Sequence, residues 1–139
     1  MSPKPFKILG IEHVGIALQS LDGVSNIFSD ILGLDFIVSE EVKDQQVKTD
    51  IYETGAGKLE FLKGTDANSP ISRFIDKNGT GIHHIALSVD NIQLAIDYLK
   101  EQDIQIIDIV PKIGAEGYKI AFLHPKSTSG ILIELCERV

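Results

Sequence analysis

The stretch Gly81–Val89 reads Gly-Ile-His-His-Ile-Ala-Leu-Ser-Val, and an earlier stretch, Gly10–Leu18, reads Gly-Ile-Glu-His-Val-Gly-Ile-Ala-Leu. The two stretches align without a gap, and this alignment places His13 on His84, 71 residues further along the chain. Both stretches are apolar and rich in β-branched residues, as buried strands are. A strand that recurs with a histidine at the same position indicates a fold built from two copies of one unit.

The segments that follow these two stretches repeat the same order of expected elements. In the first half the periodicity predicts strands and one helix, at residues 8–18, 22–32 (the helix, capped by Asp22), 35–41, 47–53 and 58–63. In the second half it predicts the same order, at residues 82–89, 92–102 (the helix, capped by Asp90), 104–109, 118–124 and 131–137. Ser69 before Pro70 predicts a linker helix over about residues 69–78. We therefore expect an α+β fold, a single domain over residues 1–139 with two tandem βαβββ modules at about 7–64 and 79–138.

Composition and charge limit the classes of partner. Hydrophobic residues make up 43% of the 139 residues and charged residues 24%, and no apolar run is long enough to cross a membrane. The N-terminus carries no secretory signal, and the single cysteine, Cys136, allows no disulfide within the chain, so a cytoplasmic location is expected. The net charge of −7 argues against a nucleic-acid partner.

Each half also carries one acidic residue inside its last strand, at Glu60 and at Glu134, with apolar neighbours on both sides. A carboxylate that is buried in such a strand is costly unless a positive charge neutralises it. A single histidine or glutamate in a strand is more often an ordinary core or surface residue. The recurrence of both in the two halves instead favours a metal site with His13, Glu60, His84 and Glu134 as ligands, since imidazole and carboxylate together suit divalent ions.

The remaining histidines and the cysteine have simpler interpretations. His83 corresponds to Glu12 in the first stretch, so the repeat does not keep it, and we interpret it as structural. His124 precedes Pro125 and is expected at a turn. Cys136 is expected on the same face as Glu134, as a small buried hydrophobic residue.

Taken together, these residues and the motifs around them resemble the vicinal oxygen chelate superfamily, which has the glyoxalase and bleomycin-resistance fold. Within that superfamily, the chain resembles the methylmalonyl-CoA epimerases over about Ile8–Glu137. The segments that carry the resemblance are Ile11–Ala17, Lys58–Leu62, Gly79–Ala86 and, as the most specific, Phe122–Ser127 with Gly130–Leu135.

The resemblance implies a cup-shaped, partly closed β-sheet around a divalent metal ion, which is Co, Mn, Ni, Zn or Mg. It implies an isomerase of propionate metabolism that interconverts (2R)- and (2S)-methylmalonyl-CoA through a metal-stabilised enolate, and it implies a homodimer. An acyl-CoA is then the substrate, and Glu134 is the candidate for one catalytic acid/base group.

Two roles stay open in this comparison. Some members of the family place a glutamate on the third strand, as the second acid/base group, where this chain has Thr49. Asp44, Gln45 and Asp50 lie nearby in sequence, although Asp50 is expected on the opposite face from Thr49, and a metal-bound water is the other candidate for this role. For the phosphates of coenzyme A the sequence offers three lysines by charge and loop position alone, namely Lys112, Lys119 and Lys126.

Three other functions are weighed against epimerisation. A glyoxalase I-type lactoylglutathione lyase uses the same four-ligand shell, but the tail motif disfavours it. An extradiol dioxygenase of this fold is expected to hold its metal with three ligands. The fourth candidate ligand of this chain, Glu60, disfavours that function. A metal-free binding or resistance protein of the same fold has no need of the repeated histidines and glutamates.

Overall fold

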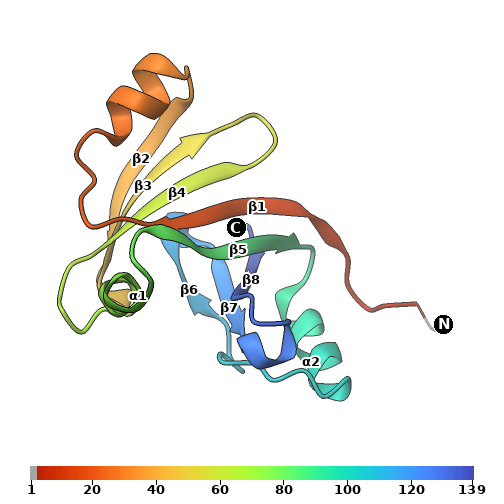
Figure 1. Ribbon diagram of the computed structural model, residues 1–139. Helices are drawn as coiled ribbons and strands as arrows, with labels where there is room; N and C mark the ends of the chain where they lie inside the picture. Colours follow the sequence, from red (N-terminus) through yellow and green to blue (C-terminus); the bar gives the residue numbers. More distant parts are fainter. Residues whose placement is uncertain (1–2) are drawn as a thin grey trace. The chain divides into compact units, whose positions relative to one another are not determined.

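The computed structural model describes residues 3–139, and Figure 1 follows the order of their elements. The strands are β1 (Ile8–Ala17), β2 (Asp35–Val42), β3 (Val47–Glu53), β4 (Lys58–Gly64), β5 (Gly81–Val89), β6 (Lys112–Ile113), β7 (Lys119–Leu123) and β8 (Ile133–Glu137). The helices are the π-helix η1 (Ser25–Ile31), the α-helices α1 (Pro70–Asn78) and α2 (Ile92–Glu101), and the short 3₁₀ turns η2 (Lys43–Gln45), η3 (Ala115–Gly117) and η4 (Pro125–Ser127). Among the described residues the strand order is β2-β3-β4-β1-β5-β8-β7-β6, a mixed sheet. The predicted α+β class and the repeated strand order are confirmed.

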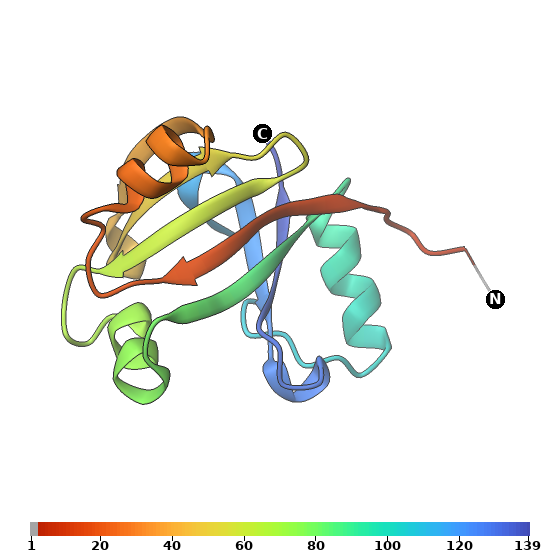
Figure 2. The same cartoon turned by 45° about the horizontal axis from the view of Figure 1, so that its top comes forward.

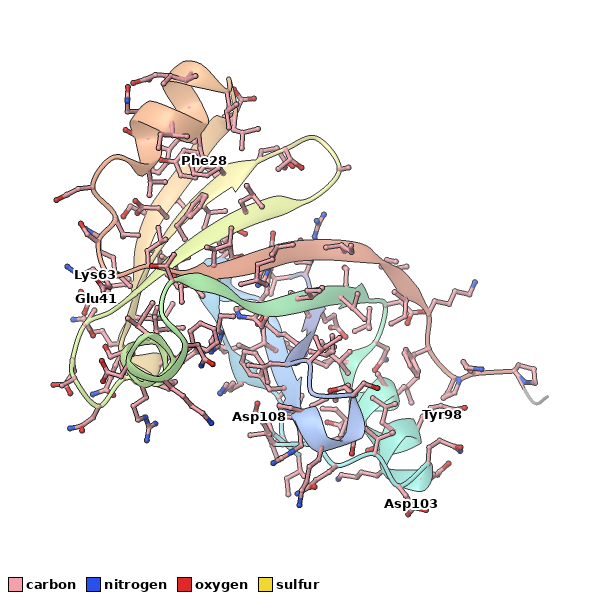
Figure 3. The ribbon with its side chains drawn as sticks, viewed as in Figure 1. Phe28, Glu41, Lys63, Tyr98, Asp103 and Asp108 are labelled. Carbon is pink, nitrogen blue, oxygen red and sulfur yellow. The ribbon has the colours of Figure 1, made fainter. Side chains whose placement is uncertain are left out.

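One compact unit comprises His13–His83. Here β1 pairs with β4 in parallel, and β4, β3 and β2 follow as antiparallel neighbours. One face of these strands packs against η1, where Tyr52 and Phe61 are almost fully buried. The ring of Phe28 on η1 lies 4.6 Å from that of Phe61, centroid to centroid, and Figure 3 shows Phe28 at the underside of this helix. The side chains of His13 and Glu60 lie on the opposite face of the same strands.

The other compact unit comprises the described residues up to Glu12 together with His84–Val139. It contains the strand order β5-β8-β7-β6, with β5 and β8 parallel. Helix α2 covers one face of these strands, as Figure 2 shows. Its Ala95 and Ile96 are fully buried against the cluster that contains Ala121 and Leu135. Because neighbouring residues of a strand point to opposite faces, Glu134 lies on the face away from α2.

The predicted strand at residues 104–109 is wrong, and the second strand of the second repeat is the short β6 instead. Residues 104–109 do run beside β7, since Ile107 N donates to Phe122 O at 2.8 Å. The Asp108 side chain then accepts the Phe122 N–H through Oδ2 at 2.9 Å, and Figure 3 labels this residue. A side chain therefore takes the hydrogen bond that a strand carbonyl would accept, and the ladder stops.

The helix starts also differ from the expected ones. Helix α2 is capped by Asn91, whose Oδ1 accepts from Leu94 N at 3.0 Å, while Asp90 accepts from Lys7 N at 2.8 Å. The first helix is the π-helix η1, which begins at Ser25 without a side-chain cap. The start of the linker helix is confirmed, because Ser69 Oγ accepts from Ile71 N at 3.1 Å. Across residues 3–139, the helices are too short and too polar to span a bilayer.

Candidate metal centre

The first histidine and glutamate of the repeat form a buried pair in the unit His13–His83. Strand β1 lies parallel to β4 with Gly15 opposite Glu60, so His13 and Glu60 share one face two residues apart in register. The His13 Nδ1 atom lies 2.9 Å from Glu60 Oε2, and each side chain is 6% exposed. Lys58, which lies opposite His13 and is also buried, adds a cation to this face.

The second histidine and glutamate form the equivalent pair in the other unit. Strand β5 lies parallel to β8 with Ala86 opposite Glu134, and Ala86 is the residue that the repeat aligns with Gly15. The two pairs therefore have the same register in the two copies. The His84 Nε2 atom lies 3.8 Å from Glu134 Oε2, and both side chains are buried.

Phe122 and Lys112 extend the face that carries His84 and Glu134. Phe122 lies opposite Glu134 on β7, and its ring meets the imidazole of His84 edge to face, with centroids 5.5 Å apart. Lys112 Nζ lies 5.4 Å from the centroid of the Phe122 ring and 3.4 Å from Asp108 Oδ1. The sequence offers no signal for Phe122 as a site residue, since only the pairing of β7 with β8 brings it beside Glu134.

The three lysines proposed for coenzyme A do not share one face. Lys112 lies opposite Ile120, and the face of Ile120 is that of Phe122 and Glu134. Lys119 lies on the other face of β7, the face that α2 covers, and Lys126 lies at the turn η4. Of the three, Lys112 alone lies on the face of the His84 and Glu134 pair.

Glu12 and Arg138 form an ion pair that the sequence analysis missed. Glu12 is fully buried, and its Oε2 accepts from Nε of Arg138 at 2.8 Å and also from Nη2. This hydrogen bond raises the pKa of Arg138, and the charge of Glu12 adds to the effect. Nothing in a single sequence relates two residues 126 positions apart. The pair links β1 to the C-terminal segment. Its β1 member, Glu12, is the residue directly before His13.

The other singled-out residues lie as the sequence analysis interpreted them. The ring of His83 packs against Phe74 with centroids 5.0 Å apart, and burial lowers the pKa of His83, as for a neutral structural imidazole. His124 lies at the turn before η4, where its Nδ1 accepts from Lys126 N at 3.1 Å. Cys136 is buried, two residues from Glu134 on the same face.

The donor chemistry of the two pairs fits a divalent cation. Each of the four side chains belongs to a group of buried residues that could hold a metal ion. These groups are His13, His84 and Glu134, and Glu12, His13 and Glu60. Two imidazoles and two carboxylates supply mixed nitrogen and oxygen ligands, the set preferred by first-row divalent ions. The two carboxylates would also balance the charge of one such ion.

A family model described as the glyoxalase, bleomycin resistance protein and dioxygenase superfamily matches residues 12–122. A mitochondrial methylmalonyl-CoA epimerase of Dictyostelium discoideum is 41% identical over 133 residues, which cover 92% of this chain and 78% of that protein.

Two solved structures of methylmalonyl-CoA epimerases are also similar to this chain. The methylmalonyl-CoA epimerase of Mycobacterium tuberculosis matches with a TM-score of 0.91 at 30% identity, covering 95% of this chain and 89% of that one. A methylmalonyl-CoA epimerase in complex with methylmalonyl-CoA and NH₄⁺ matches with a TM-score of 0.90 at 27% identity, covering 96% of both chains.

Proposed function

Because this chain belongs to the glyoxalase, bleomycin resistance protein and dioxygenase superfamily, we propose that it is an isomerase that interconverts (2R)- and (2S)-methylmalonyl-CoA. The observation that carries this proposal is the occurrence of a buried histidine–glutamate pair at the same register of both repeats, in a chain whose relatives include methylmalonyl-CoA epimerases. The substrate is taken from the relatives, and the chemistry is argued from the residues.

A divalent metal ion is the proposed cofactor, held by His13, Glu60, His84 and Glu134. The register of the two pairs supports this ligand set, because each repeat supplies one imidazole and one carboxylate from equivalent positions. Such an ion, when bound, neutralises the negative charge that develops on the thioester oxygen as the C2 proton leaves.

Glu134 is the proposed base for one face of the substrate. A carboxylate removes the C2 proton only if it is held beside the acidic carbon, and proton transfer by a positioned group typically contributes about 10²–10⁴-fold to the rate. Glu134 lies opposite Phe122 in register and beside His84, whose ring contacts that of Phe122. Lys112, over the Phe122 ring, is the proposed contact for an anionic group of the acyl-CoA.

The experiment that tests this function offers the purified protein two substrates in the presence of Co²⁺ or Mn²⁺. Methylmalonyl-CoA of one configuration is expected to be converted to the other, as measured with a coupling enzyme that consumes only the product epimer. The hemithioacetal of methylglyoxal and glutathione tests the lactoylglutathione lyase alternative. Turnover of the hemithioacetal without inversion of methylmalonyl-CoA would show that the protein is a lactoylglutathione lyase and not an epimerase. Binding without turnover of either substrate would favour the metal-free binding protein.

The homodimer that the resemblance implies and the cytoplasmic location expected from the N-terminus and the single cysteine remain predictions. Light scattering of the purified protein tests the first, with a mass of about twice the 15.2 kDa of one chain as the expected result.

A further inference from the structure

Epimerisation requires a second acid/base group, because the proton leaves C2 on one face and another proton arrives on the other face. Glu134 can serve only one of these faces. Because the second group belongs to the same reaction, this inference rests on the proposed function. The carboxylates that share a face with the other histidine–glutamate pair, that of His13 and Glu60, are the candidates for the second group. The register of the unit His13–His83 identifies the strand residues on that face.

Three rows of paired residues cross the strands on the face of His13 and Glu60. The middle row contains Gly15, Glu60, Ile51 and Val38. The row on one side contains Ala17, Leu62, Thr49 and Glu40, and the row on the other side contains His13, Lys58, Glu53 and Asp35. Among the described strand residues of this unit, the carboxylates on the face besides Glu60 are therefore those of Glu40, Glu53 and Asp35.

Two of these three carboxylates are poorly suited to proton transfer. Glu53 Oε2 accepts from Thr54 N and Gly55 N, both at 3.1 Å, so this side chain supports the turn between β3 and β4. Asp35 lies exposed at the first residue of the edge strand β2. Asp50, which is close to Thr49 in sequence, lies on the opposite face and accepts from the Ser39 hydroxyl at 2.6 Å.

Glu40 has the placement that the other two lack. It is half-buried on β2 and lies directly opposite Thr49, which is 1% exposed. Side chains directly opposite each other in an antiparallel pair have Cβ atoms about 5 Å apart. A glutamate that faces a residue as small as threonine has room to extend its side chain over that residue. The register thus places Glu40 beside Thr49, on the face that carries Glu60.

We propose that Glu40 is the second acid/base group of the epimerisation. For one epimer, the Glu134 carboxylate takes the C2 proton and the electron pair of the C–H bond moves into the enolate. The carboxylic acid form of Glu40 then donates its proton to the other face of C2, where a new C–H bond forms and a Glu40 carboxylate remains. The opposite epimer reacts in the reverse direction, and both groups exchange protons with water between turnovers.

Glu40→Gln separates the two halves of the reaction. With the wild-type protein in D₂O, both epimers are expected to exchange the C2 proton and to invert. The variant is expected to lose inversion by about 10²–10⁴-fold, while exchange into the epimer whose proton faces Glu134 stays within about tenfold of wild type. Retained exchange also shows that the variant is folded and binds its substrate.

Glu41→Gln is the matched control, because Glu41 is the next residue of the same strand, lies opposite Lys48 and points to the other face; Figure 3 labels it. This variant is expected to exchange and invert as wild type does. Inversion by Glu40→Gln at the wild-type rate, or an equal loss of exchange with both epimers, would overturn the role of Glu40. A wild-type protein that neither exchanges nor inverts would instead refute the proposed function itself.

Discussion

Glu134 and Glu60 occupy equivalent positions of the repeat, yet the proposed mechanism gives them different tasks. Both are buried beside a histidine, and both are proposed as metal ligands. Glu134 alone is also the proposed base, with Phe122 opposite it in register and His84 beside it. An amide oxygen still binds a metal ion, although less strongly than a carboxylate, but it cannot take up a proton. The two residues are therefore distinguished by the same substitution.

We expect Glu134→Gln to lower exchange of the C2 proton that faces Glu134 by about 10²–10⁴-fold, because the base is lost while the volume of the side chain is kept. Glu60→Gln is the paired control and is expected to retain exchange within about tenfold at saturating metal. Single-turnover exchange in D₂O measures both variants. Equal losses in the two variants would contradict a separate role for Glu134 as base.

Glu12 and Arg138 provide a second test at the level of single residues. Glu12 is fully buried, and the removal of its partner leaves a buried carboxylate less well satisfied. Since the Arg138 side chain is 56% exposed, water screens the pair and the expected coupling is only about 1 kcal/mol. A double-mutant cycle with Glu12→Gln and Arg138→Met, read by urea denaturation, measures this value. Strict additivity of the two free-energy changes would contradict the coupling.

At the scale of elements, the alternation of apolar residues predicted most strands of both repeats, since each strand buries one face. The alternation failed at residues 104–109, where the apolar composition suggested a strand. There the Asp108 carboxylate accepts the hydrogen bond of the Phe122 N–H. No propensity encodes that contact. The histidines and in-strand glutamates could be selected from the sequence because the repeat marks them. Glu40 could not, because its position on the site face follows from the register of β2 with β3.

The cap of α2 offers a test at this scale. Asn91→Ala is expected to destabilise the protein by about 1 kcal/mol, because Leu94 N loses its acceptor at the helix start. In hydrogen exchange, the Leu94 amide is expected to become less protected. Asp90→Ala is the matched variant, and its local effect is expected at the Lys7 amide instead. A loss of Leu94 protection in Asp90→Ala alone would contradict the assignment of Asn91 as the cap.

At the scale of the whole molecule, each repeat contributes the same pair of side chains from the same register, and the proposed metal site needs both pairs for one ion. A ligand that binds only the folded state stabilises it by about 2.7 kcal/mol at a hundredfold excess over its Kd. For a protein of this length that corresponds to a rise in Tm of about 10 °C.

We therefore expect Co²⁺ or Mn²⁺ to raise the Tm and a chelator to reverse the rise. His13→Ala and His84→Ala are each expected to abolish most of the shift, since one ion depends on both repeats. Differential scanning calorimetry of the three proteins, with metal analysis of the loaded samples, gives the stoichiometry. A full shift retained by either variant, or two ions per chain, would contradict a shared site.

Proton NMR in D₂O follows the removal of the C2 proton itself, the step through which the chain is proposed to epimerise methylmalonyl-CoA. With the metal-loaded protein, the methyl doublet of methylmalonyl-CoA is expected to collapse to a singlet as deuterium enters C2. This collapse should be much faster than without protein and should be lost on chelation. A doublet that persists at the rate of the protein-free control, with Co²⁺ or Mn²⁺ supplied, would contradict the account.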